Sequence, residues 1–323
     1  MTFTFNASTG TLTSLLTSPG PEVVVDLVLD AAHGFMYASD FDTGTIHVYS
    51  ADVNTGALNE INGSPFSSPL TSGNGGPIAL SPEGNFLFYS DATGHIVTFS
   101  ILNGVLTPGA TVTQDMNQPV QFAVDPAGKF LYAANLSDPS GGEFSVFSVD
   151  PNSGALASVV GSPFTFQDNS EPFGIVVHPS GNYIFSSLSN ASGIESLTVD
   201  RSTGALALAP NSPASIGFFP RYVALSASGS FLYVSTMGTG SVYAYSVNSS
   251  TGALTQVGSR QGDNPNQMVV DVTGKVLIGS IPGFHQVGVY ALDQMSGGFS
   301  GAPGLVAAGQ DPGAIAIVQQ PTP

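Results

Sequence analysis

A hairpin signature of the form Gly-x-Leu recurs along the whole chain of 323 residues. Its first six glycines fall at positions 10, 56, 104, 154, 204 and 252, which places them 46 to 50 residues apart. A weaker seventh copy is Ser296-Gly297-Gly298-Phe299. A period of about 40 to 50 residues is typical of propeller repeats. The seven copies therefore predict seven repeated units.

Each unit divides into four short strands. The first is apolar, as at Gln121–Val124, and ends in a turn such as Asp125-Pro126-Ala127-Gly128, which fits type I. The second reads Phe-Leu-Tyr, as at Phe231–Tyr233, the third alternates, as at Ile46–Tyr49, and the Gly-x-Leu hairpin leads into the fourth. Four-stranded antiparallel units repeated around an axis are propeller blades. We therefore predict an all-β, seven-bladed β-propeller that occupies residues 1–323 as a single domain.

Both ends of the chain contribute to the same unit. The last first-strand segment, Ala314–Ile317, is followed by only six residues, whereas the chain opens on a third-strand pattern at Thr2–Phe5. We therefore expect the seventh blade to be formed by both termini and to lack its second strand, which leaves unpaired backbone on both neighbours. We also expect that Met1 is not the natural start and that a preceding strand and an export signal are absent from this chain.

Several of these segments resemble one known family. Phe231-Leu232-Tyr233-Val234-Ser235, Phe130-Leu131-Tyr132-Ala133-Ala134-Asn135 and the Pro-x-Gly turns before them are similar to the lactonase-like seven-bladed propellers. That family includes bacterial phosphogluconolactonases, carboxymuconate lactonising enzymes and YVTN-repeat surface proteins. The resemblance covers almost the whole chain and implies the propeller fold.

The same resemblance implies an inner strand reading Gly-Pro-Arg-His, a His-Pro turn, and a following strand with Asn-Glu in the phosphogluconolactonase branch. This sequence separates those pieces. Arg221 is followed by Tyr222, the His178-Pro179 turn follows a strand without arginine, and the next strand, Ile184–Ser187, lacks the glutamate. The departures favour binding over catalysis.

Charge excludes several kinds of partner. Five Lys and Arg against 22 Asp and Glu give a formal net charge of −17, so the chain lacks the basic surface that nucleic acid requires. The same charge disfavours anionic membranes and phosphorylated substrates. No apolar run approaches the roughly 18 residues of a membrane span. We predict a monomer without nucleic acid or membrane insertion, located outside the cytoplasm, with a cytoplasmic location as the alternative.

Strand order defines two faces of a propeller. The turns after the first and third strands lie on one face, the turn face, and the connections after the second and fourth lie on the other, the loop face. The turns are nearly uniform, whereas the loops differ, as at Asn135–Glu143 and Ser259–Asn266. Function on repeat scaffolds lies where the repeats differ. We therefore expect a site on the loop face, at the mouth of the central channel.

The candidates are residues that enter the innermost strands at that mouth. Arg221 is one of five cations, and a guanidinium binds carboxylate or lactone oxygens well, although a salt bridge across the channel is the more ordinary explanation. Asp26 is a candidate general base and His285 a second acid–base candidate, with structural hydrogen bonding as the alternative. The predicted ligand-binding residues are Gln121, Glu171, Phe173, Tyr222, Asn266, Gln267 and Asp311.

The sequence contains no recognisable cofactor motif and no metal-ligand spacing among its five histidines. We predict no cofactor, with a structural Ca²⁺ as an option at the oxygen-rich loops Asp40–Gly44 and Gln261–Asn264. The favoured function is non-catalytic or weakly catalytic binding of a lactone, a carbohydrate, or a protein or glycan partner. The alternative is a hydrolase that opens a sugar or muconate-type lactone, similar to 6-phosphogluconolactonase.

Overall fold

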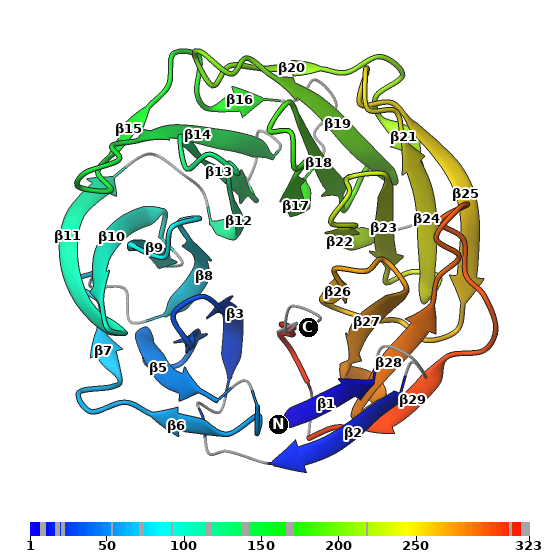
Figure 1. Ribbon diagram of the computed structural model, residues 1–323. Coiled ribbons are helices and arrows are strands. Elements are labelled where there is room, and N and C mark those ends of the chain that lie inside the picture. The colour runs from blue at the N-terminus through cyan, green and yellow to red at the C-terminus, as the bar shows by residue number, and fades with distance from the viewer. Residues whose placement is uncertain are drawn as a thin grey trace.

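The computed structural model describes residues 1–6, 11–16, 20, 23–52, 54–70, 74–91, 93–113, 118–136, 142–165, 171–217, 219–309 and 312–317. Every strand pairing in this part of the chain is antiparallel, and six sheets of four successive strands surround a central axis (Figure 1). We call these sheets blades 1 to 6 in chain order. The prediction of an all-β propeller with four-stranded antiparallel blades is therefore confirmed.

Within each blade the strands follow one another from the channel outwards. Blades 1 to 3 consist of β3 (Val24–Asp30), β4 (Phe35–Asp40), β5 (Thr45–Ala51) and β6 (Leu58–Glu60); β8 (Gly75–Leu80), β9 (Phe86–Asp91), β10 (His95–Leu102) and β11 (Val105–Thr113); β12 (Pro119–Val124), β13 (Phe130–Asn135), β14 (Glu143–Val149) and β15 (Leu156–Ser158). Blades 4 to 6 consist of β17 (Pro172–Val177), β18 (Tyr183–Leu188), β19 (Gly193–Val199) and β20 (Leu206–Leu208); β22 (Pro220–Leu225), β23 (Phe231–Thr236), β24 (Ser241–Val247) and β25 (Leu254–Gln261); β26 (Met268–Val270), β27 (Val276–Ile281), β28 (Gln286–Ala291) and β29 (Gly304–Ala307).

The turn chemistry explains where the first and third strands end. The Gly128 N–H donates to the Asp125 carbonyl at 2.7 Å, which closes the turn expected between the first and second strands. The Gly204 N–H likewise donates to the Asp200 carbonyl at 2.7 Å in the Gly-x-Leu hairpin. Gly204 has φ 79°, a left-handed conformation that glycine adopts without strain. Residues close together in the sequence therefore fix where the first and third strands of a blade end.

Three blades contain a fifth short strand that the sequence did not predict. A serine side chain after the fourth strand accepts a backbone N–H from the third strand, as Ser64 Oγ does from Val48 at 2.9 Å and Ser162 Oγ does from Val146 at 2.9 Å. The serine replaces a backbone carbonyl, and the chain then rejoins the edge of the third strand. The resulting strands are β7 (Phe66–Ser67), β16 (Phe164–Thr165) and β21 (Ala214–Ser215), which pair with β5, β14 and β19.

Alternating side chains form separate cores between neighbouring blades. Leu131 and Ala133 on β13 pack towards blade 2, whereas Tyr132 and Ala134 pack towards blade 4, and all four are completely buried. Burying one large apolar side chain contributes about 1.5 to 3 kcal/mol. Because both faces of blades 2 to 6 are covered in this way, these blades are held together by side chains of the second and third strands.

The remaining place in the ring holds a smaller sheet. β1 (Thr2–Asn6) and β2 (Thr11–Leu16) pair with each other and lie between blades 6 and 1 (Figure 1). Phe3, Phe5, Ile315 and Ile317 pack on the apolar face of blade 6 that is turned away from blade 5. The expected strand at Ala314–Ile317 is wrong in one respect, because these residues form no ladder with any described strand and are not a regular strand.

The described residues contain one helical turn, η1 (Pro282–Phe284). None of their helices has the length and apolar character needed to cross a membrane.

Candidate functional site

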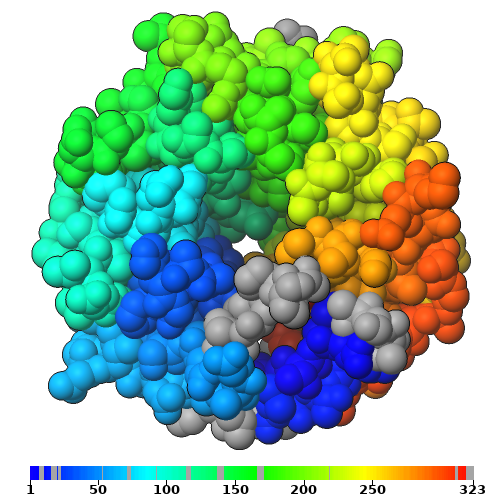
Figure 2. Space-filling view, viewed as in Figure 1, coloured from blue at the N-terminus to red at the C-terminus, as the bar shows by residue number. Residues whose placement is uncertain are grey.

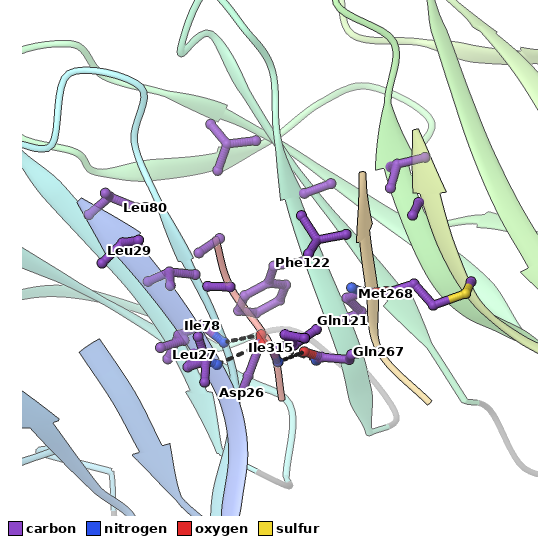
Figure 3. Close-up of a pocket in the computed structure, with 18 of the residues that line it drawn as sticks. Asp26, Leu27, Leu29, Ile78, Leu80, Gln121, Phe122, Gln267, Met268 and Ile315 are labelled. Atoms are coloured by element: carbon purple, nitrogen blue, oxygen red, sulfur yellow. Dashed lines mark hydrogen bonds between the residues drawn. The ribbon is translucent and has the colours of Figure 1, made fainter. Parts of the chain in front are cut away.

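The inner strands enclose a cavity of about 630 Å³ on the propeller axis. Figure 2 shows the ring hollowed at its centre, and Figure 3 shows the residues that line this space. Most of the wall is apolar, with Leu27, Leu29, Leu80, Val124 and Leu225 among its side chains. Its polar lining includes Asp26, Gln121, Tyr222 and Gln267.

These four polar residues share one position in the repeat. Each lies four residues before the first residue of the Pro-x-Gly-type turn, which is Asp30, Asp125, Ser226 or Asp271 in the respective blade. Equivalent positions in a propeller lie at one height along the channel, so the four side chains form a polar level. Counting back from each turn is the sequence signal that identifies this level.

Three side chains of the polar level bond to the backbone of the next inner segment around the ring. Gln121 Oε1 accepts the Ile175 N–H at 2.9 Å, and Asp26 Oδ2 accepts the Ile78 N–H at 3.3 Å. Gln267 Oε1 accepts the Ile315 N–H at 3.1 Å. An inner strand exposes one edge of its backbone to the channel, and these bonds satisfy N–H groups on that edge. Part of the polar level is therefore structural.

Asp26 has this structural role and also an unusually high pKa. Its Oδ1 accepts the Leu27 N–H at 2.9 Å and Gln267 Nε2 at 3.2 Å, as Figure 3 shows. Burial in the channel raises the pKa of Asp26 from 3.8 to about 6, although these hydrogen bonds act in the opposite direction. Among the described residues Oδ2 accepts the Ile78 N–H, and it retains acceptor capacity towards the cavity. At neutral pH the carboxylate is ionised and can accept a proton from water.

Arg221 lies one residue nearer the loop face than Tyr222. Its guanidinium carbon is 4.3 Å from the centre of the Phe173 ring, and Phe173 meets Tyr222 edge to face at 5.3 Å. No ion pair joins Arg221 to a carboxylate in the described ranges, so the arginine rests on an aromatic ring there. Burial raises the pKa of Tyr222, with the charge of Arg221 lowering it and that of Asp26 raising it. The tyrosine therefore lies within electrostatic range of both groups.

The other predicted site residues lie away from the polar level. The Glu171 N–H donates to Asn190 Oδ1 at 2.7 Å, so the loop of its own blade holds this residue. The Asn266 N–H donates to the Ser280 carbonyl at 2.7 Å. His285 is exposed at the end of η1, with φ 54°. These residues do not line the cavity, nor do Arg221 and Phe173, and Asp311 falls outside the described residues.

The two loops considered for calcium use their carboxylates internally. Asp40 Oδ1 accepts the Asp42 N–H at 3.0 Å, and its Oδ2 accepts the Thr43 hydroxyl at 2.7 Å. Asp263 pairs with Arg260 at 3.4 Å. Where the structure describes the chain, no group of three or more His, Cys, Asp or Glu residues is arranged to hold a metal. A structural Ca²⁺ stays a prediction without a defined site.

The backbones of β17 and β22 approach each other closely at Gly174, and this contact positions Arg221. The contact predicts the effect of Gly174→Ala. A Cβ at Gly174 would clash with the Arg221 carbonyl oxygen and lie 3.0 Å from the Val223 nitrogen. The same carbonyl accepts the Ser187 hydroxyl. The substitution should force β22 outwards and lower the free energy of unfolding by about 1 to 3 kcal/mol in a urea titration. Gly283→Ala is the matched control because its Cβ would meet nothing within 4 Å, and equal midpoints for both variants would contradict the expectation.

Repeated antiparallel blades around a ligand-sized axial cavity define a β-propeller with a channel site. The family model described as "Lactonase, 7-bladed beta-propeller" matches residues 27–165, 158–270 and 223–310. The chain therefore belongs to the lactonase family of seven-bladed β-propellers, as the sequence motifs indicated. No functionally curated protein matches the sequence significantly.

Solved structures with the same fold come from several bacteria. One from Bacteroides fragilis, provisionally assigned as a 6-phosphogluconolactonase, has a TM-score of 0.85 and 18% identity and covers 98% of this chain and 93% of its own. A Bacteroides uniformis structure with the same provisional assignment has a TM-score of 0.82 and 19% identity, with coverages of 96% and 92%. The periplasmic gluconolactonase of Pseudomonas aeruginosa has a TM-score of 0.81 and 16% identity, with coverages of 96% and 92%. At these identities the similarity establishes the fold alone.

Proposed function

We propose that this protein hydrolyses a sugar lactone in its central channel. The observation that carries the proposal is Asp26, whose carboxyl has a pKa of about 6 and lines a cavity of about 630 Å³ in a member of the lactonase family. That volume suits a small-molecule ligand. A base whose pKa lies near the working pH transfers protons efficiently. Family membership and the named neighbours favour this hydrolase alternative over the non-catalytic binding that the sequence motifs suggested.

The proposed reaction uses one base and one cation. Asp26 accepts a proton from a water molecule as the water oxygen attacks the lactone carbonyl carbon. Arg221 stabilises the negative charge that develops on the carbonyl oxygen. The ring C–O bond then breaks, and the leaving alkoxide takes the proton from Asp26, which yields the hydroxy acid and regenerates the carboxylate.

Charge and aromatic rings define the substrate class that we propose, a lactone of an unphosphorylated sugar acid. Arg221 is the cation near the described polar level, and a protein of net charge −17 disfavours a phosphate dianion. Phe173 and Tyr222 offer apolar ring faces beside the guanidinium. The structural neighbours are described as a 6-phosphogluconolactonase and a gluconolactonase, and the charge of this chain favours the second kind of substrate.

Arg221→Gln tests the proposed role of the guanidinium. With glucono-δ-lactone as substrate, we expect kcat/KM to fall about 10²- to 10³-fold, the loss typical of removing one group that stabilises an oxyanion. Acid release in a pH-stat measures the rate. Arg260→Gln is the control, because that arginine binds Asp263 and the Gly301 carbonyl instead. The wild-type protein should also be tested on a panel of phosphorylated and unphosphorylated sugar lactones. If it hydrolyses none of them, ligand binding without catalysis would be the better assignment.

We also propose that the β1–β2 sheet and residues 312–317 together form the seventh blade. The Ile315 N–H bonds to Gln267 in the way that Ile175 bonds to Gln121, which supports an inner-strand position for this segment. Ser280 Oγ donates to the Gly313 carbonyl at 2.7 Å, from blade 6. The family description as seven-bladed supports the same arrangement. In the described residues this blade has the first, third and fourth strand positions occupied, but not the second.

An extracytoplasmic location is part of the proposal. The neighbour from P. aeruginosa is described as periplasmic, which supports it. The low content of charged residues and the absence of cysteine are compatible with this location.

A further inference from the structure

The cavity continues beyond the polar level, along the inner strands and towards the turn face. Figure 3 shows Asp26, Gln121 and Gln267 gathered at one end of the cavity, with Leu29 and Leu80 towards the other end. We call the part between the polar level and the turns the apolar section. Its wall consists of the three residues before the turn in blades 1 to 6, together with Ile315–Ile317. Strand residues advance about 3.3 Å each, so this section is about 10 Å long.

The described residues that line the apolar section are all apolar. They include Leu27, Val176 and Leu225. The next polar residue of the lining is Ser81, in the turn of blade 2, and its hydroxyl oxygen accepts the Phe86 N–H at 3.0 Å. A water molecule held in a cavity needs two to four polar partners, and the side chains of the apolar section offer it none. This part of the wall therefore favours an apolar occupant over water.

Small side chains keep the apolar section open. Its middle position, two residues before each turn, is alanine or valine in all six blades, and the alanines are Ala79, Ala123 and Ala224. Leucine or phenylalanine at this position would add bulk beside the axis. Protein interiors normally fill such space with side chains to the density of an organic crystal. An apolar space left open on the axis is thus suited to a ligand that completes the packing.

The cavity is larger than a single lactone ring requires. Its volume of about 630 Å³ lies in the range that buries ligands of drug size. The proposed reaction places the ring at the polar level, at one end, which leaves the remaining volume for a substituent on that ring. Asp26 is the charged side chain among the described lining residues, so a neutral ring suits this end better than the carboxylate of a fatty acid.

We propose that the apolar section is a subsite for an unbranched aliphatic chain carried by the lactone substrate. The inference rests on the proposed function for the position of the ring at the polar level, from which the chain extends towards the turn face. Single bonds of about 1.5 Å advance an extended chain by about 1.3 Å per carbon, so about eight carbons span the section. Leu27 and Leu29 have apolar surface free to contact the chain, because both are only partly buried and belong to no core cluster of the described residues. Glucono-δ-lactone would fill the polar end alone.

Binding of a homologous series tests the subsite without any turnover. The probes are δ-valerolactams with an unbranched alkyl group, from methyl to decyl, on the ring carbon next to nitrogen. A lactam keeps the ring and the carbonyl group of a lactone but resists hydrolysis. We expect the dissociation constant measured by calorimetry to fall about two- to four-fold for each added methylene, because each one leaves water for apolar surroundings. The gain should stop at about eight carbons, where the chain reaches the turns.

A second readout of the same titrations is the heat capacity change of binding. It should become more negative as the chain grows, which is the signature of apolar surface buried on binding. Equal dissociation constants for the methyl and octyl lactams would overturn the subsite.

Leu29→Trp should shorten the subsite at the end near the turns. Leu29 directly precedes the turn of blade 1, so the indole would occupy the space of the last carbons of the chain. The octyl and decyl lactams should then bind about as the butyl lactam does, a loss of at least about ten-fold relative to the wild type. Leu102→Trp is the matched control, since Leu102 is 75% exposed at the end of β10 and does not line the cavity.

The position of the chain is decided by comparing these two variants. Thermal unfolding verifies that both are folded, and if Leu29→Trp does not fold, the wild-type series alone decides. A folded Leu29→Trp variant that still prefers the octyl to the butyl lactam as strongly as Leu102→Trp does would place the chain elsewhere and overturn the proposal.

The subsite and the hydrolase can fail separately. Lactam affinity that rises with chain length, in a protein that hydrolyses no lactone, would support the subsite and refute the hydrolase. Hydrolysis of methyl and octyl δ-valerolactones with equal kcat/KM, together with equal lactam affinities, would support the hydrolase and refute the subsite. A kcat/KM that rises with chain length in parallel with lactam affinity would support both.

Discussion

Asp26→Asn should lower kcat for lactone hydrolysis by about 10²- to 10⁴-fold, the range expected when a general base is removed. The asparagine side chain has nearly the same shape, and its carbonyl oxygen can still accept the Ile78 or Leu27 N–H. It has no basic group at pH 7 and cannot take a proton from water. The loss should therefore appear in kcat, with the fold retained.

The pH dependence distinguishes a base from a merely structural carboxylate. Because burial raises the pKa of Asp26 to about 6, kcat/KM of the wild type should rise through pH 6 and level off above it. The residual activity of Asp26→Asn should lack this step. Asp52→Asn is the control, since Asp52 lies in an exposed hairpin of the turn face, and it should preserve rate and profile. A variant at position 26 that retains the wild-type profile would remove Asp26 from the mechanism.

The same shift in pKa has a consequence for stability. A carboxyl whose pKa is higher in the folded than in the unfolded protein stabilises the fold fully below the unfolded value of 3.8. This contribution disappears as the pH rises through about 6. Its size is at most about 3 kcal/mol, because one pKa unit corresponds to about 1.4 kcal/mol. Urea titrations at pH 4 and pH 8 should therefore show a smaller loss of stability for Asp26→Asn than for the wild type.

Arg201→Leu, on the turn face, should lower the free energy of unfolding by about 2 to 3 kcal/mol. Arg201 Nη1 bonds to Asp125 Oδ1 and to the Gly181 carbonyl at 3.1 Å, and Nη2 donates to Asp125 Oδ2 at 3.3 Å. Asp125 is completely buried in blade 3, whereas Arg201 belongs to blade 4 and is 30% exposed. The interaction thus joins two blades.

Stability is lost because the Asp125 carboxylate would remain buried without its partner charge. Without Arg201, the Asp125 side chain keeps the Ala127 and Lys129 N–H donors at 3.1 and 3.2 Å but no counter-charge. Breaking a buried ion pair typically costs about 3 to 5 kcal/mol, and the exposure of Arg201 reduces this through solvent. Urea unfolding measures the change, and lactone turnover in the channel should persist.

A double variant provides the control for this pair. Asp125→Asn combined with Arg201→Leu removes the buried charge together with its partner, so it should be more stable than Arg201→Leu alone. A single variant within about 0.5 kcal/mol of the wild type would show that the pair contributes little to holding blades 3 and 4 together.

Local sequence determined much of the architecture by itself. The Gly-x-Leu period, the Pro-x-Gly turns and the alternation of the third strands depend on residues close in the chain, and they correctly predicted four-stranded antiparallel blades. Strand order placed Asp26, Gln121, Tyr222 and Gln267 near the channel, together with candidates that do not line it, and counting back from each turn would have separated the two groups. The fifth strands were missed because a serine side chain, and not a strand pattern, starts each of them.

Only the tertiary structure decided which of these residues act together. Asp26 and Gln267 are separated by 241 positions and meet because the ring closes. The stacking of Arg221 on Phe173 joins two neighbouring blades, and the pKa of Asp26 depends on how deeply the assembled channel buries its carboxyl. Turns and strand alternation reflect short-range conformational preferences, whereas contacts across blades and desolvation exist only once distant segments have packed around a common axis.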